Sequence, residues 1–282
     1  MHRSLFALTL VLMAISIVSS YADDEALPSG EACGAVGLNA YKLIMGPIKI
    51  DRVQANASGL TFSKKTGTLF AVTNSPQHLV ELSTAGVTLR IIKLVGFDDT
   101  EGVVHIEGNT FAVTEERRFL LTTFELDDAA TEVQHGEAKK VPVDEIYGDN
   151  GLEGIAYEAA SRRFFGTKEK DPMKTFFIPW AAVEGEGDDI REPWNAEENS
   201  FGLSDLSGAH FDASSGNLLI VSDESCVVVE ITPAGKEVSR LSLKEGSAGL
   251  KQDIPQPEGV AMDAEGNLYI CSEPNLFYRF GK

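Results

Sequence analysis

Beyond residue 22 the chain consists of short apolar runs separated by segments rich in Gly, Asn, Asp and Ser. The runs are about five to seven residues long, and the helical spacing of apolar residues is nearly absent. Runs of this length bounded by turn residues predict β-strands joined by tight turns. The pattern therefore predicts an all-β protein.

One sequence unit recurs five times. Its clearest copy runs from Glu258-Gly-Val-Ala-Met-Asp through a Gly-Asn turn to Leu268-Tyr-Ile-Cys-Ser-Glu and a third apolar run at Leu276. The other copies begin at Ser58, Glu101, Glu153 and Ser207. A period of roughly 40–50 residues with four short strands per unit is typical of β-propeller blades, which bury their faces by stacking around an axis. We therefore expect five four-stranded blades.

The ends of the repeat array predict how the ring closes. The last copy holds only three strands, whereas the strand-like run over residues 40–50 precedes the first copy. We expect this run to supply the missing outer strand, because closure removes an exposed sheet edge. A sixth, degenerate blade around residues 170–200 is the alternative. The acidic run over residues 184–199 is interpreted instead as a solvated surface loop.

The first 22 residues have the features of a secretory signal. Arg3 precedes an apolar run over residues 5–18, and Ser20-Tyr21-Ala22 forms a small-x-small cleavage site. The run is 14 residues long, shorter than the ~20 residues of a transmembrane helix. We predict cleavage after residue 22, a linker over residues 23–35 and one propeller domain over residues 36–282, in the periplasm or secreted, with no membrane span. An uncleaved anchor is the alternative.

Charge limits the possible partners. The sequence has 24 Lys and Arg against 43 Asp and Glu, a formal net charge of −19. Nucleic acid and anionic lipid require clustered positive charge, so both are excluded as expected partners. Cations, small molecules, glycans and proteins remain.

The cysteines give little guidance. Export would place Cys33, Cys226 and Cys271 in an oxidising compartment, where at most two of them can pair. We predict no particular disulfide. Cys226 and Cys271 stand in apolar strand-like runs and are expected to be buried.

The repeat places polar residues on one face near the axis. The first strand of each copy begins at a residue followed by Gly, and the second strand returns to the same face. The start residues are Ser58, Glu101, Glu153, Ser207 and Glu258, and the end residues are Asn74, Glu116, Glu169, Glu224 and Glu273. Two positions before the start residues stand Asn56, Asp99, Gly151, Asp205 and Gln256. We expect the Gly after each start residue to let the backbone pass close to the axis.

Carboxylates that converge in this way repel one another, and three outcomes are open. They can bind a divalent cation, retain protons because their pKa is raised, or pair with nearby basic residues. An all-oxygen donor set favours Ca²⁺, and the five His show no spacing for zinc or copper. The basic candidates for pairing are Arg117, Lys168, Lys170 and Arg279.

Other side chains in the repeats carry weaker signals. His105 and His210 fall within innermost strands and could line the channel as bases for lactone or ester hydrolysis, or be buried structural residues. Four aromatic residues are expected to pack between blades, namely Phe164, Phe165, Tyr269 and Phe277.

Several segments together resemble a known family. Gly148-Asp-Asn-Gly-Leu-Glu-Gly-Ile-Ala-Tyr, Thr167-Lys-Glu-Lys-Asp-Pro, the Leu-Ser-Gly-Ala around Gly208, Pro257-Glu-Gly-Val-Ala-Met-Asp and Ser272-Glu-Pro-Asn-Leu-Phe-Tyr-Arg-Phe resemble the SdiA-regulated (YjiK-like) family over nearly all of residues 40–280. The resemblance implies a β-propeller related to NHL-repeat proteins, exported or envelope-associated in bacteria, with an acidic metal centre on the axis. By motif this centre maps to Glu101, Glu153, Glu258 and Asp205. Ser58 and Ser207 interrupt the acidic pattern.

Two functions follow as hypotheses. The first is a calcium-stabilised binding module whose acidic face takes a small molecule, a glycan or a protein. The alternative is a calcium-dependent hydrolase of a lactone or ester, in which the ion polarises the carbonyl. Glu153 or Glu258 would then hold the ion, and a neighbouring carboxylate or His would activate water. The sequence assigns no catalytic residue.

Overall fold

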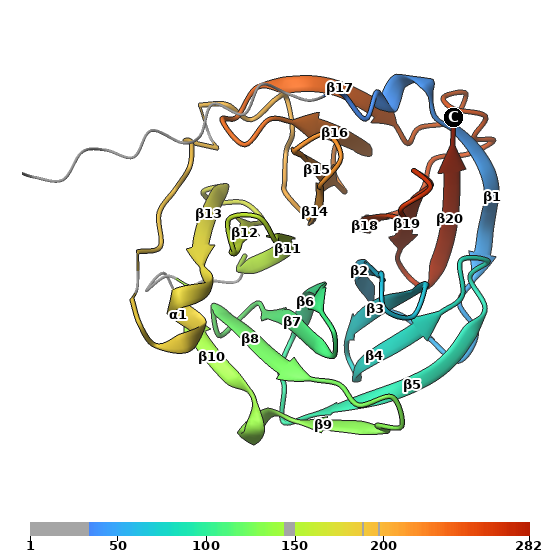
Figure 1. Cartoon of the computed structure of the whole chain (residues 1–282). Helices are drawn as coiled ribbons and strands as arrows, with labels where there is room; N and C mark the ends of the chain where they lie inside the picture. The colour runs from blue at the N-terminus through green and yellow to red at the C-terminus, as the bar shows by residue number, and fades with distance from the viewer. Residues whose placement is uncertain (1–33, 144–149, 188, 197) are drawn as a thin grey trace, which may run out of the picture.

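Five sheets stand around a common axis as the blades of a propeller (Figure 1). The computed structural model describes residues 34–143, 150–187, 189–196 and 198–282. The predicted all-β, five-bladed fold is confirmed. The predicted signal over residues 1–22, most of the linker over residues 23–35, and Cys33 lie outside the described residues.

The strands follow the sequence repeat. The innermost strands are β2 (Ala57–Ser63), β6 (Thr100–Glu107), β11 (Leu152–Glu158), β14 (Gly208–Asp212) and β18 (Pro257–Met262). The second strands are β3 (Thr68–Asn74), β7 (Thr110–Glu115), β12 (Arg163–Lys168), β15 (Asn217–Ser222) and β19 (Leu268–Ser272). The third strands are β4 (Gln77–Leu82), β8 (Leu120–Glu125), β13 (Lys174–Pro179), β16 (Val227–Ile231) and β20 (Leu276–Gly281). The outer strands are β5 (Thr88–Val95), β10 (Lys139–Pro142), β17 (Glu237–Ser242) and β1 (Lys42–Lys49).

The N-terminal strand closes the ring as predicted. β1 pairs antiparallel with β20, so the fifth blade has the order β1-β20-β19-β18 (Figure 1). The short 3-10 helix η1 (Leu38–Ala40) precedes it. The buried Glu230 carboxylate of the fourth blade accepts hydrogen bonds from the N–H groups of Val36 (2.7 Å) and Gly37 (3.0 Å). The segment before β1 is therefore fixed to the neighbouring blade.

The third blade departs from the expected four strands. Within the part of the chain that the structure describes, it contains three strands, β11, β12 and β13. After β13 the chain forms the short helix α1 (Trp180–Glu184), and Arg191 makes a single bridge to Phe177. Trp194 is buried and stacks on Phe165 with 5.2 Å between the ring centroids. The solvated loop expected over residues 184–199 is therefore anchored by an aromatic side chain. Burial of this large ring takes the place of an outer strand.

The first blade gains a strand that the repeat did not predict. β9 (Glu132–Gln134) lies after β8 in the chain of the second blade, but it pairs in parallel with β5 of the first blade. The segment ends in the 3-10 helix η2 (His135–Glu137). Main-chain hydrogen bonds thus link the outer edges of two blades.

The expected inter-blade core is confirmed. Phe164, Phe165, Tyr269 and Phe277 are all buried. Cys226 and Cys271 are buried free thiols. Cys271 lies in β19, whereas Cys226 lies in the turn before β16 with φ 53°, rather than in a strand. Among the described residues no helix has the length and apolar character to cross a membrane.

Five glycines line the narrowest part of the space along the propeller axis. They follow the start residues directly and are Gly59, Gly102, Gly154, Gly208 and Gly259. A Cβ on Gly59 would lie 2.5 Å from the Glu101 carbonyl oxygen, and a Cβ on Gly259 would lie 2.6 Å from that of Ser58. The predicted close approach is confirmed. The space at this level is about 10 Å³, enough for about one water molecule, so the axis opens as two separate mouths.

Candidate metal centre

A repeated hydrogen bond positions the end residues around one mouth. In four blades, the N–H of the end residue donates to the carbonyl oxygen two positions before the start residue. The distances are 3.4 Å (Asn74 to Asn56), 2.9 Å (Glu116 to Asp99), 3.2 Å (Glu169 to Gly151) and 3.0 Å (Glu273 to Gln256). This bond brings the two chain segments, and the side chains that they carry, together.

The same four blades have an irregular register at the start residue. The pairing shifts between Ala57 and Leu60, Thr100 and Val103, Leu152 and Ile155, and Pro257 and Gly259. Such bulges redirect a side chain out of the regular pleat. They place Ser58, Glu101, Glu153 and Glu258 at the mouth. β14 of the fourth blade begins at Gly208, after the start residue Ser207, whose N–H donates to the Val221 carbonyl oxygen at 3.0 Å.

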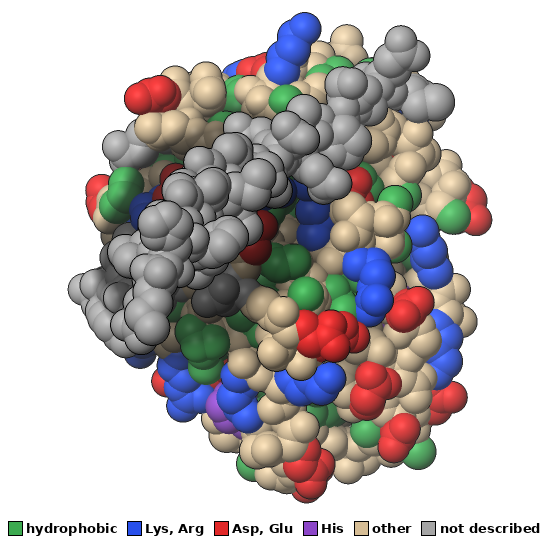
Figure 2. Space-filling model, turned by 60° about the vertical axis from the view of Figure 1, so that its left-hand side comes forward, with side chains coloured by type: hydrophobic (Ala, Val, Ile, Leu, Met, Phe, Trp, Pro, Cys, Tyr) green, Lys and Arg blue, Asp and Glu red, His purple; other side chains and the backbone are tan. Residues whose placement is uncertain are grey.

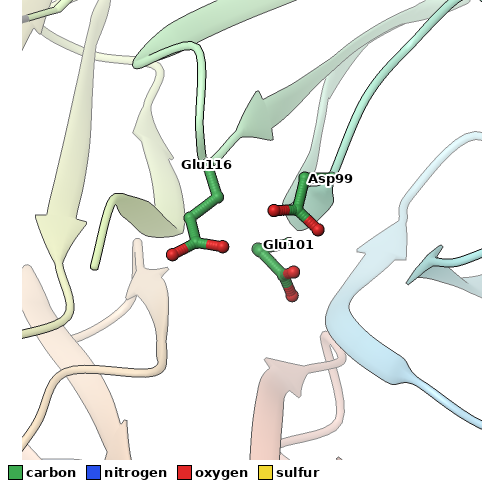
Figure 3. A group of neighbouring side chains, drawn as sticks. All are labelled: Asp99, Glu101 and Glu116. Atoms are coloured by element: carbon green, nitrogen blue, oxygen red, sulfur yellow. The ribbon is translucent and has the colours of Figure 1, made fainter. Parts of the chain in front are cut away.

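The first group of carboxylates belongs to the second blade. Asp99, Glu101 and Glu116 are buried, and one oxygen from each lies within 4.8 Å of one from each of the others. Figure 3 shows the three side chains gathered around a common space. Asp99 adopts a left-handed φ of 50°, a conformation uncommon for residues other than Gly.

The second group extends into the third blade. Glu116, Glu153 and Glu169 meet the same 4.8 Å criterion, so Glu116 belongs to both groups. The Glu116 carboxylate also accepts a hydrogen bond from the Gly151 N–H at 2.9 Å. Five carboxylates from two adjacent blades therefore form one continuous cluster, which we call the carboxylate cluster: Asp99, Glu101, Glu116, Glu153 and Glu169.

Basic side chains neutralise only the edges of the carboxylate cluster. Arg117 Nε lies 2.8 Å from Asp99 Oδ2, and Lys170 Nζ lies 2.9 Å from Glu169 Oε1. Within the described residues, no basic nitrogen forms an ion pair with the three central members, Glu101, Glu116 and Glu153.

Two other basic residues expected at this mouth have different hydrogen-bond partners. Arg279 donates to Asn267 Oδ1 at 2.9 Å, and the Lys168 ammonium donates to the Lys170 carbonyl oxygen. The salt-bridge alternative therefore accounts for only part of the negative charge.

Burial and mutual repulsion change the acidity of the central members. Burial raises the pKa of Glu101 to about 7, although hydrogen bonds from Asn74 and Ser58 oppose the rise. Burial likewise raises the pKa of Glu116 to about 7, against the hydrogen bond from Gly151. The pKa of Glu153 is raised well above its usual range by burial and then by the charges of Glu101 and Glu116.

Asp205, a predicted metal ligand, lies in a different environment. Its buried carboxylate accepts hydrogen bonds from Ser207 Oγ (2.8 Å), Asp223 N (3.0 Å), Glu224 N (3.2 Å) and Ser222 Oγ. It belongs to neither of the two carboxylate groups described above. These contacts give Asp205 a structural role in fixing the turn after β15.

The other predicted residues lie around the same mouth. Glu258 is half-buried and outside both carboxylate groups, and its pKa is raised by burial and then by Asp223 and Glu101. Asn74 Nδ2 donates to Glu101 Oε1 at 2.9 Å. Glu224 pairs with Lys170 at 2.9 Å. Burial raises the pKa of Glu273.

The sequence pattern did not single out Asp99 as a ligand. It marked the position two before the start residue, where acids occur only in the second and fourth copies. Asp99 and Asp205 are thus equivalent in the repeat, yet only Asp99 joins a carboxylate group. The hydrogen-bond donors around Asp205, which are tertiary contacts, separate the two.

Neither candidate histidine lies in the carboxylate cluster. His105 stands four residues after Glu101 on β6, about 13 Å along the strand. His105 and His210 both line the opposite mouth. Neither is therefore placed to serve as the base of a reaction at the carboxylates.

The residues present fit a hard divalent cation. The carboxylate cluster offers only oxygen donors, and Ca²⁺ accepts six to eight oxygens in a flexible geometry. On the face seen in Figure 2, acidic and basic side chains lie interspersed, and further acidic side chains lie deeper near the centre. Buried carboxylates without basic partners are stabilised when a cation neutralises them.

The comparison with protein families agrees with this architecture. The SdiA-regulated family matches residues 34–281. The chain belongs to the SdiA-regulated family. The resemblance stated from the sequence motifs is confirmed, and it covers every blade of this SdiA-regulated protein.

Solved structures share the fold at low sequence identity. Regucalcin of Agrobacterium tumefaciens, a calcium-binding protein, has a TM-score of 0.53 and 12% identity, covering 84% of this chain and 93% of its own. A luciferin-regenerating enzyme has a TM-score of 0.53 and 13% identity, with coverages of 84% and 96%. A chain of a nidogen–laminin complex has a TM-score of 0.52 and 17% identity, with coverages of 78% and 73%. At these identities the likeness shows the fold alone.

Proposed function

We propose that this SdiA-regulated protein is an exported calcium-binding propeller whose ion organises the acidic mouth for a ligand or partner. The observation that carries the proposal is the carboxylate cluster, in which two groups of acids from adjacent blades, all buried except the half-buried Glu169, share Glu116. Glu101, Glu116 and Glu153 would supply the central oxygens, with Asp99 and Glu169 at the sides.

Calcium is favoured over softer metals by the donor set. The carboxylate cluster contains no His or Cys, and zinc and copper sites in proteins are built largely on those residues. A calcium-binding protein with the same fold, regucalcin, is consistent with this choice. The ion would compensate the burial and the repulsion that raise the pKa of Glu101 and Glu116 to about 7.

Export is the second part of the proposal and rests on the sequence. The apolar run over residues 5–18 and the Ser20-Tyr21-Ala22 site have the form of a cleaved signal. Calcium sites of extracellular modules are tuned to dissociation constants of about 10⁻⁴–10⁻³ M. A periplasmic or secreted location would expose the protein to calcium in that range. N-terminal sequencing of the protein recovered from the periplasm or medium tests the cleavage after residue 22.

The decisive experiment is a calcium titration of the chelated mature protein by calorimetry and thermal melting. We expect saturable binding and a raised melting temperature, both lost in Glu116→Gln and Glu153→Gln. Glu265→Gln is the matched control, because Glu265 is exposed in the turn between β18 and β19. An unchanged calcium response in both cluster variants would refute the assignment.

Hydrolysis of a lactone or ester is the second candidate. The observation that favours it is the pKa of about 7 at Glu101 and Glu116, because a general acid or base works best near the operating pH. The base would then be a carboxylate, since the histidines lie at the other mouth. Turnover of a lactone panel with and without calcium is the test. Rates equal to the buffer control in both conditions would exclude this candidate for those lactones.

A further inference from the structure

The mouth opposite the carboxylate cluster contains a separate cavity. Its volume is about 400 Å³, within the range of small-molecule sites. It is built from the far ends of the innermost strands of all five blades, which contribute Leu60, Val104, Ile155, Ala209 and Met262. The ring of axial glycines lies between this cavity and the carboxylate cluster, with space for about one water molecule. The cavity is therefore a cup with its own opening.

The inner wall of the cup is mainly apolar. Phe62, Ile106 and Phe211 are half-buried and line it, and Val104 and Met262 are buried beside them. The Tyr157 ring lies on the same wall. A surface of this kind gains free energy when it covers the apolar part of a ligand, in proportion to the area removed from water.

Two imidazoles give the cup its polar character. His105 Nε2 lies 3.1 Å from the Gly108 carbonyl oxygen and donates to it. The His210 ring makes no hydrogen bond to the described residues, and burial lowers its pKa to about 4. A neutral His210 therefore offers one N–H donor to a ligand inside the cup.

The rim carries two lysines and one glutamate, so it is less acidic than the molecule as a whole. Its charged lining residues are Lys64, Lys65 and Glu107, in a chain whose formal net charge is −19. Lys65 is engaged by Asp128 at 2.6 Å. Lys64 is exposed in the turn after β2 and forms no ion pair within the described residues. Lys64 is therefore available to an anion.

We propose that this cup binds a small carboxylate with an apolar body. The apolar body would lie against Phe62, Phe211 and Met262, and the carboxylate would accept a hydrogen bond from His210 and face the Lys64 ammonium. The site lies on the opposite side of the axial glycines from the calcium site and would function whether or not calcium binds.

Octanoate is a suitable probe, with octan-1-ol as the uncharged probe of the same chain length. We expect octanoate to bind saturably with a dissociation constant of about 1 mM or tighter, and octan-1-ol to bind at least several-fold more weakly. The His210 imidazole signals in NMR spectra should shift on octanoate binding. The calcium response in a parallel titration should not change.

Three variants test the geometry. His210→Phe keeps a ring of similar size and should weaken octanoate about tenfold, because it removes the donor. Lys64→Gln should weaken octanoate about threefold, as expected for an exposed charge, and leave octan-1-ol unchanged. Ala213 is exposed at the rim, so Ala213→Trp should obstruct the opening without disturbing the fold. Lys251→Gln is the matched control, because Lys251 is exposed and does not line the cup.

The outcomes that overturn the proposal are specific. If octanoate shows no saturable binding up to about 10 mM, the cup is not a carboxylate site. A ligand of its size can bind far more tightly than this in a matched cavity. Binding that persists unchanged in both His210→Phe and Ala213→Trp places octanoate elsewhere on the protein. Equal affinity for octanoate and octan-1-ol would show that the cup does not recognise the carboxylate.

Discussion

The second and fourth blades carry an acid at the same position of the repeat, and the two acids have different environments. Asp99 lies with Glu101 and Glu116, and among the described residues its one basic partner is Arg117. Asp205 accepts hydrogen bonds from two serine hydroxyls and two main-chain N–H groups. The start residue differs as well, since it is Glu101 in the second blade and Ser207 in the fourth.

This difference shows how one repeat position serves either binding or stability. A carboxylate whose lone pairs are occupied by protein donors needs no cation. Where the neighbours are other carboxylates, the negative charge remains uncompensated and favours a proton or a metal. Serine at the start position of the fourth blade, Ser207, supplies the donor that Glu101 cannot supply in the second. The identity of the start residue therefore determines the role of the acid two positions before it.

The largest expected effect is on stability, in the fourth blade. Asp205→Ala removes the acceptor for Ser207, Ser222 and the N–H groups of Asp223 and Glu224. Leaving such buried donors without partners should lower the free energy of unfolding by about 3–5 kcal/mol. Urea unfolding of the chelated protein measures this change. Asp263→Ala is a matched control for the loss of a turn-capping aspartate, since Asp263 bonds Asn267 and Tyr269 at the far mouth. A loss below about 1 kcal/mol would contradict the structural role of Asp205.

The fold was largely predictable from the sequence, whereas the carboxylate cluster was predictable only in part. The strand pattern and the period gave the five blades, and the run over residues 40–50 gave the closing strand β1. The pattern could not show that Trp194 replaces an outer strand in the third blade, because this depends on packing against Phe165. The sequence pattern placed Glu101 and Asp205 together among the predicted metal ligands, because it contains only positions along the chain. The serine and main-chain donors that separate the two acids depend on tertiary contacts.

A second effect is the pH dependence of the metal-free protein. Burial raises the folded-state pKa of Glu101 to about 7 from its usual value of 4.5. The folded state therefore binds more protons than the unfolded state between these values, and stability falls as pH rises through this window. At about 1.4 kcal/mol per pKa unit, the loss is about 3 kcal/mol between pH 4.5 and pH 8. Chemical unfolding at several pH values with chelator measures it. If the free energy of unfolding of the metal-free protein rose over this range, burial would not raise the pKa of Glu101.

The third effect separates the two blades by their response to calcium. Calcium at 100 times its dissociation constant should stabilise the protein by about 2.7 kcal/mol. Asp99→Asn should remove most of this gain, because it takes a negative charge from a carboxylate group. Asp205→Asn should leave the gain intact, although the variant is less stable in absolute terms. Melting curves of both variants with and without calcium measure this stabilisation. If the two variants lost it equally, Asp205 would be a ligand of the ion.

The last test neutralises a single central acid of the metal-free protein. Glu101→Gln keeps the Oε1 acceptor for Asn74 Nδ2 and removes a buried negative charge that has no basic partner within the described residues. Because Gln does not titrate, the variant should avoid the loss that ionisation of Glu101 causes, so its free energy of unfolding at pH 8 should be higher by up to about 3 kcal/mol. Below pH 4.5 the wild-type carboxyl is protonated as well, so the two proteins should have the same stability there. The variant should therefore lose calcium binding and be more stable without metal. Unfolding curves at the two pH values measure the gain in stability. Glu224→Gln, which alters an acid paired with Lys170, should give no such gain, because its charge is already compensated.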